Sequence, residues 1–219
     1  MHELTSAAIA LMVCVAAGSF LAGCCNGAII TSFLFYHDDI RKHGSHNAGL
    51  TNFYRVYGGK FAVCVILIDM LKAFVAVKLG SIVFGEYLGL RLEGEYFSAL
   101  FCVIGHIFPA FYSFKGGKGI LCSGTLLLLL DWRIALVGWG VFVVLWLTTR
   151  YVSLGSVAAA ISFPITTQLV FRDWGLTALG TCIALLVLWA HRSNIKRLLN
   201  GTESKFHFHV NGPKTGEDA

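Results

Sequence analysis

Long apolar segments alternate with short polar ones along most of the chain. A transmembrane helix needs about 20 mostly apolar residues, so each long segment is a candidate span. The pattern predicts seven such helices, the fourth of them short for a full crossing, over about 5–36, 61–80, 96–112, 120–130, 134–149, 156–171 and 176–190. We therefore expect an all-α integral membrane protein, in which a bundle of seven transmembrane helices occupies residues 1–200 and a polar tail follows over 201–219.

Small and charged residues inside these segments indicate how the helices meet. Gly23 and Gly27 form a GxxxG pair, which allows another helix to approach closely. Asp69 and Lys72 lie three residues apart on one face of the second predicted helix. Charges at that depth are costly, so they either neutralise each other as a buried pair or face a wet cavity. In both cases they mark the helix face that looks into the bundle.

The composition supports a membrane location and excludes other classes of function. The chain is 56% hydrophobic and 13% charged, which is about half the charged fraction of a soluble domain. Its net charge of +5 is therefore interpreted through membrane topology, and no nucleic-acid partner is expected. The seven cysteines are odd in number and lack CxxC spacing, which argues against disulfides, zinc or another bound metal.

Basic residues are distributed unequally between the two ends of the predicted helices. Arg91, Arg133 and Arg172 fall on one side. Twelve of the 17 lysines and arginines fall on the other side: Arg41, Lys42, Arg55, Lys60, Lys115, Lys118, Arg150, Arg192, Lys196, Arg197, Lys205 and Lys214. By the positive-inside rule the twelve-cation side is cytoplasmic, with the N-terminus outside and the C-terminus inside. No basic region precedes the first apolar segment, so we expect a retained helix and not a signal peptide.

The segment GSHNAGLTNFYR (44–55) is a polar stretch between two predicted helices. Its glycines at positions 44 and 49 can adopt positive φ and let backbone N–H groups converge on an anion. Hydroxyl and amide side chains add neutral donors, and Arg55 adds a bidentate fork for phosphate. Ordinary turns have a similar composition, so this segment alone does not define a site.

Two further polar motifs fall on the same side of the predicted membrane. FKGGKG (114–119) combines glycines with Lys115 and Lys118, as phosphate-binding loops do, but it is not a Walker A sequence and implies no nucleotide. HRSNIKRLLNG (191–201) is expected to continue the last helix into the interface. Either motif alone is also typical of a basic membrane anchor. Together with 44–55 they predict an anion site for a phosphorylated substrate, with His106 and His191 nearby for one proton transfer.

The order of these motifs resembles one family. GSHNAGLTNFYR, DMLK, GHIFPAFYSFKGGKGI, YVSLG and HRSNIKRLLNGTE are similar, over about 44–203, to the successive motifs of the bacterial acyl-phosphate:glycerol-3-phosphate acyltransferases, the PlsY family. The resemblance implies a seven-helix inner-membrane enzyme of phospholipid synthesis, with its active site at the cytoplasmic face. Such an enzyme makes lysophosphatidic acid and phosphate from acyl phosphate and glycerol 3-phosphate, without a cofactor.

The resemblance also implies which residues form the site. The implied catalytic residues are Ser45, His106, His191 and Asn194. The implied substrate-binding residues are Asn47, Gly49, Thr51, Asn52, Arg55, Lys115, Gly116, Gly117, Lys118, Gly119, Ser153, Arg197 and Glu203. The family usually has Gly-Asn-Pro-Gly-Ala where this chain has HNAGL (46–50) and Val-Ala-Thr where it has ILC (120–122), which concerns acyl-chain fit and rate more than reaction class.

We expect direct attack of a glycerol hydroxyl on the acyl carbonyl, because no GxSxG elbow or activated cysteine is evident. In this hypothesis Arg55, Lys115 and Lys118 bind phosphates, and Asn194 orients the nucleophile or donates to the oxyanion. His191, His106 or the substrate's own phosphate serves as base. The lipid bilayer is the expected environment, and the sequence leaves the oligomeric state undefined.

Two other functions are consistent with part of the pattern. A small transporter of an organic phosphate would use Asp69 and Lys72 in a polar path across the membrane. The later helices carry almost no charge within their apolar spans, and no inverted repeat is visible. A non-catalytic lipid-binding scaffold would explain the basic face but not the clustered small polar side chains. His207 and His209 in the tail are expected to be a surface pair.

Overall fold

The computed structural model describes residues 6–206, which are helical with short connections and contain no β-strand. The elements are α1 Ser6–Cys24, α2 Gly27–Tyr36, α3 Leu50–Tyr57, α4 Ala62–Leu88, α5 Arg91–Ile107, α6 Ile120–Leu130, α7 Trp132–Thr149, α8 Val152–Phe171, α9 Trp174–Ala190 and α10 Arg192–Leu199, with short 3₁₀ turns at Ile40–Lys42 and Ala110–Tyr112. The all-α prediction is confirmed for this part of the chain.

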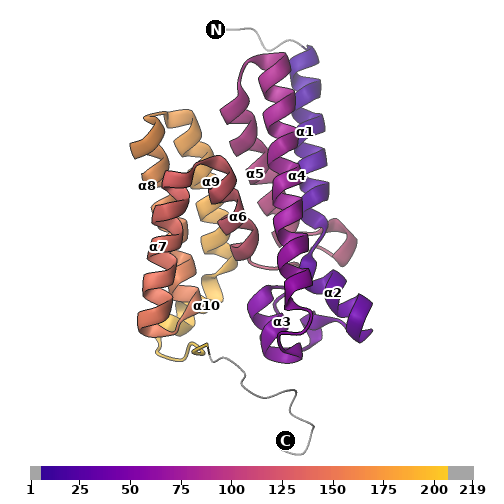
Figure 1. Ribbon diagram of the computed structural model, residues 1–219, viewed down its shortest axis with the longest axis vertical. Coiled ribbons are helices and arrows are strands. Elements are labelled where there is room, and N and C mark those ends of the chain that lie inside the picture. The colour runs from indigo at the N-terminus through magenta and orange to yellow at the C-terminus, as the bar shows by residue number, and fades with distance from the viewer. Residues whose placement is uncertain (1–5, 207–219) are drawn as a thin grey trace, which may run out of the picture.

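The helices form two groups that stand side by side (Figure 1). One group packs α1, α4 and α5 against each other, with α2 and α3 at its lower end as drawn. The other packs α7 against α8 and α8 against α9, and the short α6 contacts both groups. The polar connections that carry the three motifs therefore lie at one end of the molecule.

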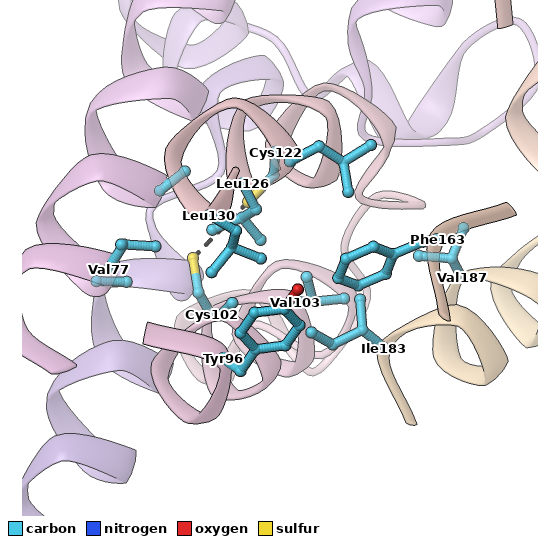
Figure 2. Close-up of a cluster of buried hydrophobic side chains, with 14 of the residues drawn as sticks. Val77, Tyr96, Cys102, Val103, Cys122, Leu126, Leu130, Phe163, Ile183 and Val187 are labelled. Carbon is cyan, nitrogen blue, oxygen red and sulfur yellow. Dashed lines mark hydrogen bonds between the residues drawn. The ribbon is translucent and has the colours of Figure 1, made fainter. Parts of the chain in front are cut away.

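A shared apolar core joins the two groups above the motif-bearing end. Tyr96 of α5, Leu126 of α6 and Phe163 of α8 are buried together in it (Figure 2). The ring of Tyr96 stacks on Phe163, and its hydroxyl lies 3.1 Å from Oγ1 of Thr167. Such contacts between residues far apart in the chain set the relative position of the groups.

The cysteines are all free thiols, as predicted. Cys102 of α5 and Cys122 of α6 are fully buried, and their sulfur atoms lie 3.7 Å apart in the same core (Figure 2). Both behave as small apolar packing residues.

The first predicted helix is broken where a continuous one was expected. α1 ends at Cys24 and α2 begins at Gly27. The Lys72 ammonium donates to the carbonyl of Cys25 at 3.1 Å, and the N–H of Gly27 donates to Asp69 at 3.1 Å. These contacts replace helical hydrogen bonds that the break removes, which makes it tolerable inside a bundle. The charged pair that the sequence placed within the second helix therefore stabilises the break.

Of the other predicted boundaries, one is confirmed and two changed. The fourth helix was predicted over 120–130, and α6 has these bounds. The acidic segment 86–95 was expected to be a loop, but α4 runs to Leu88 and α5 begins at Arg91. Glu95 lies within α5 and accepts a hydrogen bond from Ser81 at 2.8 Å, so its charge has a partner inside the bundle. The last helix does not continue straight, because α10 is bent by 62° from α9.

Glycines allow the closest helix contacts in the first group. A Cβ on Gly23 would meet the carbonyl oxygen of Cys102, and one on Gly105 would meet that of Phe20. α1 and α5 therefore touch through their backbones, and a Cβ on Gly27 would meet α4 at Val65. The GxxxG prediction is confirmed, with its two glycines facing different helices.

We expect Gly105→Ala to lower the thermal unfolding midpoint in detergent. The added methyl group would collide with the backbone of α1, and overpacking of this kind costs about 1–3 kcal/mol. Gly140→Ala is the matched control, since a Cβ at Gly140 of α7 meets nothing within 4 Å. It should be neutral or stabilising, because alanine favours helix by up to about 1 kcal/mol over glycine. Equal midpoints for the two variants would contradict the close α1–α5 contact.

Several elements are long and apolar enough to cross a membrane. They are Ser6–Tyr36, Arg91–Tyr112, Trp132–Thr149 and Val152–Phe171, and the bent pair α9–α10 is a fifth candidate. These spans define a multi-pass membrane protein.

Candidate active site

A cavity of about 670 Å³ lies between the two helix groups at the motif-bearing end. Its mouth is polar, and its interior is lined by apolar side chains of α6, α7, α8 and α9. Most residues implied by the family resemblance line it: Ser45, Asn47, Gly49, Thr51, Asn52, Arg55, His106, Lys118, Gly119, Ser153, His191, Asn194, Arg197 and Glu203. Lys115, Gly116 and Gly117 do not. The fold thus brings all three motifs to one hollow, although they are far apart in sequence.

Asn52 organises the first motif from inside. Its side chain is 2% exposed, and Oδ1 accepts the N–H of Ser45 at 2.8 Å. Nδ2 donates to the carbonyls of His43 and Asn47 at 3.0 and 3.1 Å. Since these bonds use the amide within the segment, Asn52 shapes the loop that carries Ser45 and Thr51.

The backbone of the first motif differs from the sequence expectation at one glycine. Gly44 has φ +57°, in the left-handed region as predicted. Gly49 has φ −147° and instead forms the N-cap of α3. His46 adopts the second left-handed conformation, with φ +57°, and its Nδ1 lies 3.1 Å from the carbonyl of Arg41.

The Lys/Gly loop uses its glycines differently from the way its sequence indicates. The N–H groups of Gly116 and Gly117 donate to the carbonyls of Ile107 and His106 at 3.1 and 3.2 Å. These donors are therefore used to hold the loop on the end of α5. Gly119, with φ +78°, then turns the chain into α6, whose uncapped first turn lines the cavity.

Three helix N-termini converge on the cavity mouth. They belong to α3, α6 and α8, whose N-cap residues Gly49, Gly119 and Tyr151 provide no side-chain cap. By contrast, Asp131 and Asp173 cap α7 and α9. Uncapped first turns offer free N–H donors and a partial positive charge, which favours bound anions.

A chain of hydrogen bonds joins the second and third motifs across the mouth. Lys118 donates to Oδ1 of Asn194, and Nδ2 of Asn194 donates to Glu203 at 2.7 Å. Glu203 also accepts from Ser153 and from Nε of Arg197, each at 2.7 Å. The sequence implied substrate binding for Glu203, but its carboxylate is occupied in holding α8 and α10 in place.

Two ionisable side chains at the mouth have pKa values below their ordinary ones. Burial opposes ionisation of Glu203, but hydrogen bonds from Ser153, Asn194 and Arg197 outweigh it and lower the pKa of Glu203. Burial, followed by repulsion from Arg197, lowers the pKa of Lys118 to about 8. The surroundings of Lys118 therefore disfavour its charged form, which a neighbouring anion would stabilise.

The two histidines have opposite hydrogen-bonding roles. Nδ1 of His106 lies 2.6 Å from Nζ of Lys72, and an ammonium can only donate, so this nitrogen accepts and Nε2 carries the proton. Nδ1 of His191 lies 2.8 Å from the carbonyl of Val187, which can only accept, so here Nδ1 carries the proton. Nε2 of His191 is left with a lone pair at the cavity and can accept a proton.

Several residues that build this site do not stand out in the sequence. Asn26 caps α2 and donates to the carbonyl of Ala48 at 3.1 Å, while Arg41 donates to the carbonyls of Tyr112 and Lys115 at 2.7 and 3.1 Å. Oγ of Ser123 lines the cavity, is buried and makes no hydrogen bond within the described residues. Asparagine, arginine and serine are too common near helix ends for their sequence positions to reveal such roles.

The described start of the predicted polar tail, residues 201–206, packs beside the cavity. The N–H of Phe206 donates to the carbonyl of Arg150 at 2.8 Å, and the Phe206 ring lies 5.8 Å from that of Tyr54. Phe206 lines the cavity together with Glu203. Residues 201–206 therefore belong to the site. His207 and His209 lie outside the described residues, and within 6–206 no group of three or more potential metal ligands gathers.

This architecture defines a multi-pass membrane protein whose cavity joins a polar, anion-attracting mouth to an apolar interior. Residues 13–201 match the family model described as glycerol-3-phosphate acyltransferase. The chain therefore belongs to the glycerol-3-phosphate acyltransferase family and is a membrane acyltransferase.

Named relatives and solved structures agree with this assignment. Glycerol-3-phosphate acyltransferases of Finegoldia magna and Fusobacterium nucleatum are 42% and 41% identical to the chain, over 85% and 78% of its length and 91% and 85% of theirs. The crystal structure of PlsY (YgiH), an integral membrane glycerol 3-phosphate acyltransferase, in its glycerol 3-phosphate form has a TM-score of 0.79 at 30% identity, covering 90% of this chain and 96% of that one. Its lysophosphatidic acid form has a TM-score of 0.77 at 28% identity, covering 90% and 95%.

Proposed function

We propose that this protein transfers a fatty acyl group from acyl phosphate to glycerol 3-phosphate, giving lysophosphatidic acid and inorganic phosphate. The observation that carries the proposal is the composition of the cavity between the helix groups. Uncapped helix N-termini and the cations Arg55, Lys118 and Arg197 surround its mouth, and an apolar interior follows directly. Both substrates are anionic at one end, and acyl phosphate carries a long hydrocarbon chain, so the cavity complements them in charge and in polarity.

The reaction requires one displacement. The attacking hydroxyl oxygen of glycerol 3-phosphate bonds to the acyl carbon, the bond from that carbon to the phosphate oxygen breaks, and phosphate leaves with the bonding electrons. We assign the hydroxyl proton to Nε2 of His191, because Nδ1 of that ring is used on the carbonyl of Val187, whereas Nε2 of His106 already carries a proton. Asn194 and Lys118 orient the phosphorylated substrate. A His191→Gln variant with an undiminished kcat would assign the proton to the substrate's phosphate instead.

Positioning and charge stabilisation are the enzyme's remaining contributions. The acyl phosphate is activated by its leaving group, so no covalent enzyme intermediate is needed. The free N–H groups at the start of α6 and the hydroxyls of Ser45, Thr51 and Ser123 are the neutral donors available to the phosphate and to the developing oxyanion.

We infer seven spans, with the N-terminus outside and the active site at the cytoplasmic face of the bacterial inner membrane. Besides the five candidate spans, we count α4 as the sixth and the short α6 as the seventh. α4 has 27 residues, and two of its charged residues, Asp69 and Lys72, are paired within the bundle. The cation-rich connections lie at the cavity end, which supports a cytoplasmic mouth by the positive-inside rule.

The structure gives less support to a transporter of organic phosphate. Asp69 and Lys72 are the charges that would have marked its path, and they lie 2.7 Å apart and almost completely buried. Lys72 uses its three N–H groups on Asp69, Cys25 and His106. These charges therefore stabilise the protein interior and do not line a polar path across the membrane.

Phosphate release by the purified protein tests the proposal. With palmitoyl phosphate, we expect release that depends on glycerol 3-phosphate and is matched mole for mole by lysophosphatidic acid. Release without an acceptor would indicate a hydrolase. Transport of glycerol 3-phosphate into liposomes, without any release of phosphate from acyl phosphate, would overturn the proposal in favour of a transporter.

The depressed pKa of Lys118 predicts the pH dependence of substrate capture. Lys118 loses its proton as pH rises through about 8, whereas the phosphate of glycerol 3-phosphate is a dianion above about pH 6. We expect kcat/KM for glycerol 3-phosphate to fall about tenfold per pH unit above pH 8. Lys118→Arg keeps its charge throughout this range and should give a flat profile up to about pH 9.5. The same fall in the variant would exclude Lys118 as its cause.

A further inference from the structure

The buried cluster Asp69–Lys72–His106 lies directly behind the anion-binding end of the cavity. The side chains of these residues are between 2% and 3% exposed, and they come from α4 and α5. Nζ of Lys72 is 2.7 Å from Asp69 Oδ1 and 2.6 Å from Nδ1 of His106. Asp69 itself is 3.8 Å from that nitrogen, too far for a hydrogen bond, so among residues 6–206 the hydrogen bond to Nδ1 comes from Lys72.

The other edge of the His106 ring faces the Lys/Gly loop. A Cβ on Gly117 would collide with Nε2, and one on Gly119 would lie 3.8 Å from Cδ2 of the same ring. Within the described residues Nε2 makes no hydrogen bond, although His106 is only 2% exposed and lines the cavity. Because His106 lines the cavity, this N–H is free to donate a hydrogen bond to a ligand bound there.

We propose that the Asp69–Lys72 pair positions His106 for the reaction: Lys72 holds the ring in the Nε2–H tautomer, which presents a fixed neutral donor to the phosphate group bound at the start of α6. This inference rests on the proposed function for the identity of the anion. Asp69 keeps Lys72 in place and balances its charge, while His106 donates to the substrate. Asp69 and Lys72 are positioning residues, since Lys72 does not line the cavity and the carboxylate of Asp69, which does, is held by Lys72 and by the N–H of Gly27.

The pair also holds the break between α1 and α2, so a simple loss of activity after substitution would not distinguish the two roles. Two double variants separate them. Both replace Asp69 by Asn and remove the buried charges together: D69N/K72Q keeps an amide N–H that can donate to His106, whereas D69N/K72M removes the donor. We expect D69N/K72Q to remain within about threefold of wild type and D69N/K72M to lose about 100-fold in kcat.

A double-mutant cycle with His106→Gln then tests coupling. Both double variants are also made in the His106→Gln background. If the pair acts through His106, the kcat values of D69N/K72Q and D69N/K72M in that background should differ by less than about twofold. A 100-fold difference between them there would show that the pair acts only on the helix break and would overturn the proposal.

Nitrogen-15 NMR of histidine-labelled wild-type protein provides a readout that does not depend on turnover. The His106→Gln variant is needed only to assign the His106 resonance. We expect a pyridine-type Nδ1 and a protonated Nε2 for His106, with the Nε2 resonance shifting on titration with glycerol 3-phosphate or inorganic phosphate. A protonated Nδ1, or an Nε2 resonance that neither anion moves, would overturn the proposal. Failure of the proposed function appears separately, as an absence of lysophosphatidic acid formation by wild type.

Discussion

A Lys118→Met variant is expected to lose about 1,000-fold in kcat/KM for glycerol 3-phosphate, equivalent to about 4 kcal/mol of transition-state stabilisation. Lys118 is the cation that donates to Asn194, and it lies at the start of α6, where free helix N–H groups also face the cavity. Its removal leaves Oδ1 of Asn194 without its donor and removes a charge that is well placed to contact phosphate. Steady-state kinetics at pH 7, with saturating palmitoyl phosphate, measure the effect.

Lys115→Met is the matched control, since it removes the same charge from the same loop. The Lys115 side chain is exposed and lies outside the lining of the cavity, and its carbonyl is held by Arg41. We expect less than about a threefold change, as for an exposed charge that acts only through screened long-range attraction. Comparable losses in the two variants would show that the loop acts as a diffuse positive field, and would contradict a contact specific to Lys118.

The second large effect is expected when the apolar interior is blocked. Ala184 of α9 is 4% exposed and lines the cavity, seven residues and so about 10 Å along the helix from His191 at the mouth. Ala184→Phe would fill the space that we assign to the acyl chain. Burial contributes about 0.8 kcal/mol per methylene, so excluding only three methylenes would cost about 2.4 kcal/mol, or about 60-fold in kcat/KM for palmitoyl phosphate.

Two comparisons make this test specific to the acyl chain. Leu185→Phe adds a ring at the next position, which is 60% exposed on the outer face of α9, and should leave kcat/KM for palmitoyl phosphate within about twofold. Acetyl phosphate, which has no chain to bury, should be used equally by wild type and Ala184→Phe. An equal loss with both donors would mean that the substitution disturbs the mouth, and the cavity interior would then not be the acyl site.

The outline of the site was already present in the sequence because its chemistry is concentrated in short motifs. Of the residues implied by resemblance, 14 line one cavity, among them Arg55, Lys118 and Asn194. Such motifs can be recognised in a sequence because the glycines, cations and small polar side chains that form an anion-binding loop must be close together along the chain. Glu203 and Gly117 differ from the prediction because their partners lie elsewhere in the fold.

Glu203 and Gly117 illustrate that limit. The motif places both near a phosphate, yet Glu203 is used on Ser153, 50 residues away, and the N–H of Gly117 is used on His106. A polar group is free to bind a ligand only if it makes no hydrogen bond to the rest of the protein. These hydrogen bonds can be identified only from the three-dimensional structure.

The sequence by itself determined that the chain is an all-helical membrane protein, that its cations gather on one side of the predicted spans, and that α6 is a short helix following a Lys/Gly loop. These properties follow from hydrophobic period and local charge, which do not depend on the neighbours of a segment. Only the tertiary structure decided that the first helix breaks at Cys25, that α10 turns away from α9, and that His106 and His191 carry their protons on different nitrogens. The break and the two tautomers were each decided by a buried group finding its hydrogen-bond partner. For the break at Cys25 that partner is Lys72, 47 residues away along the chain.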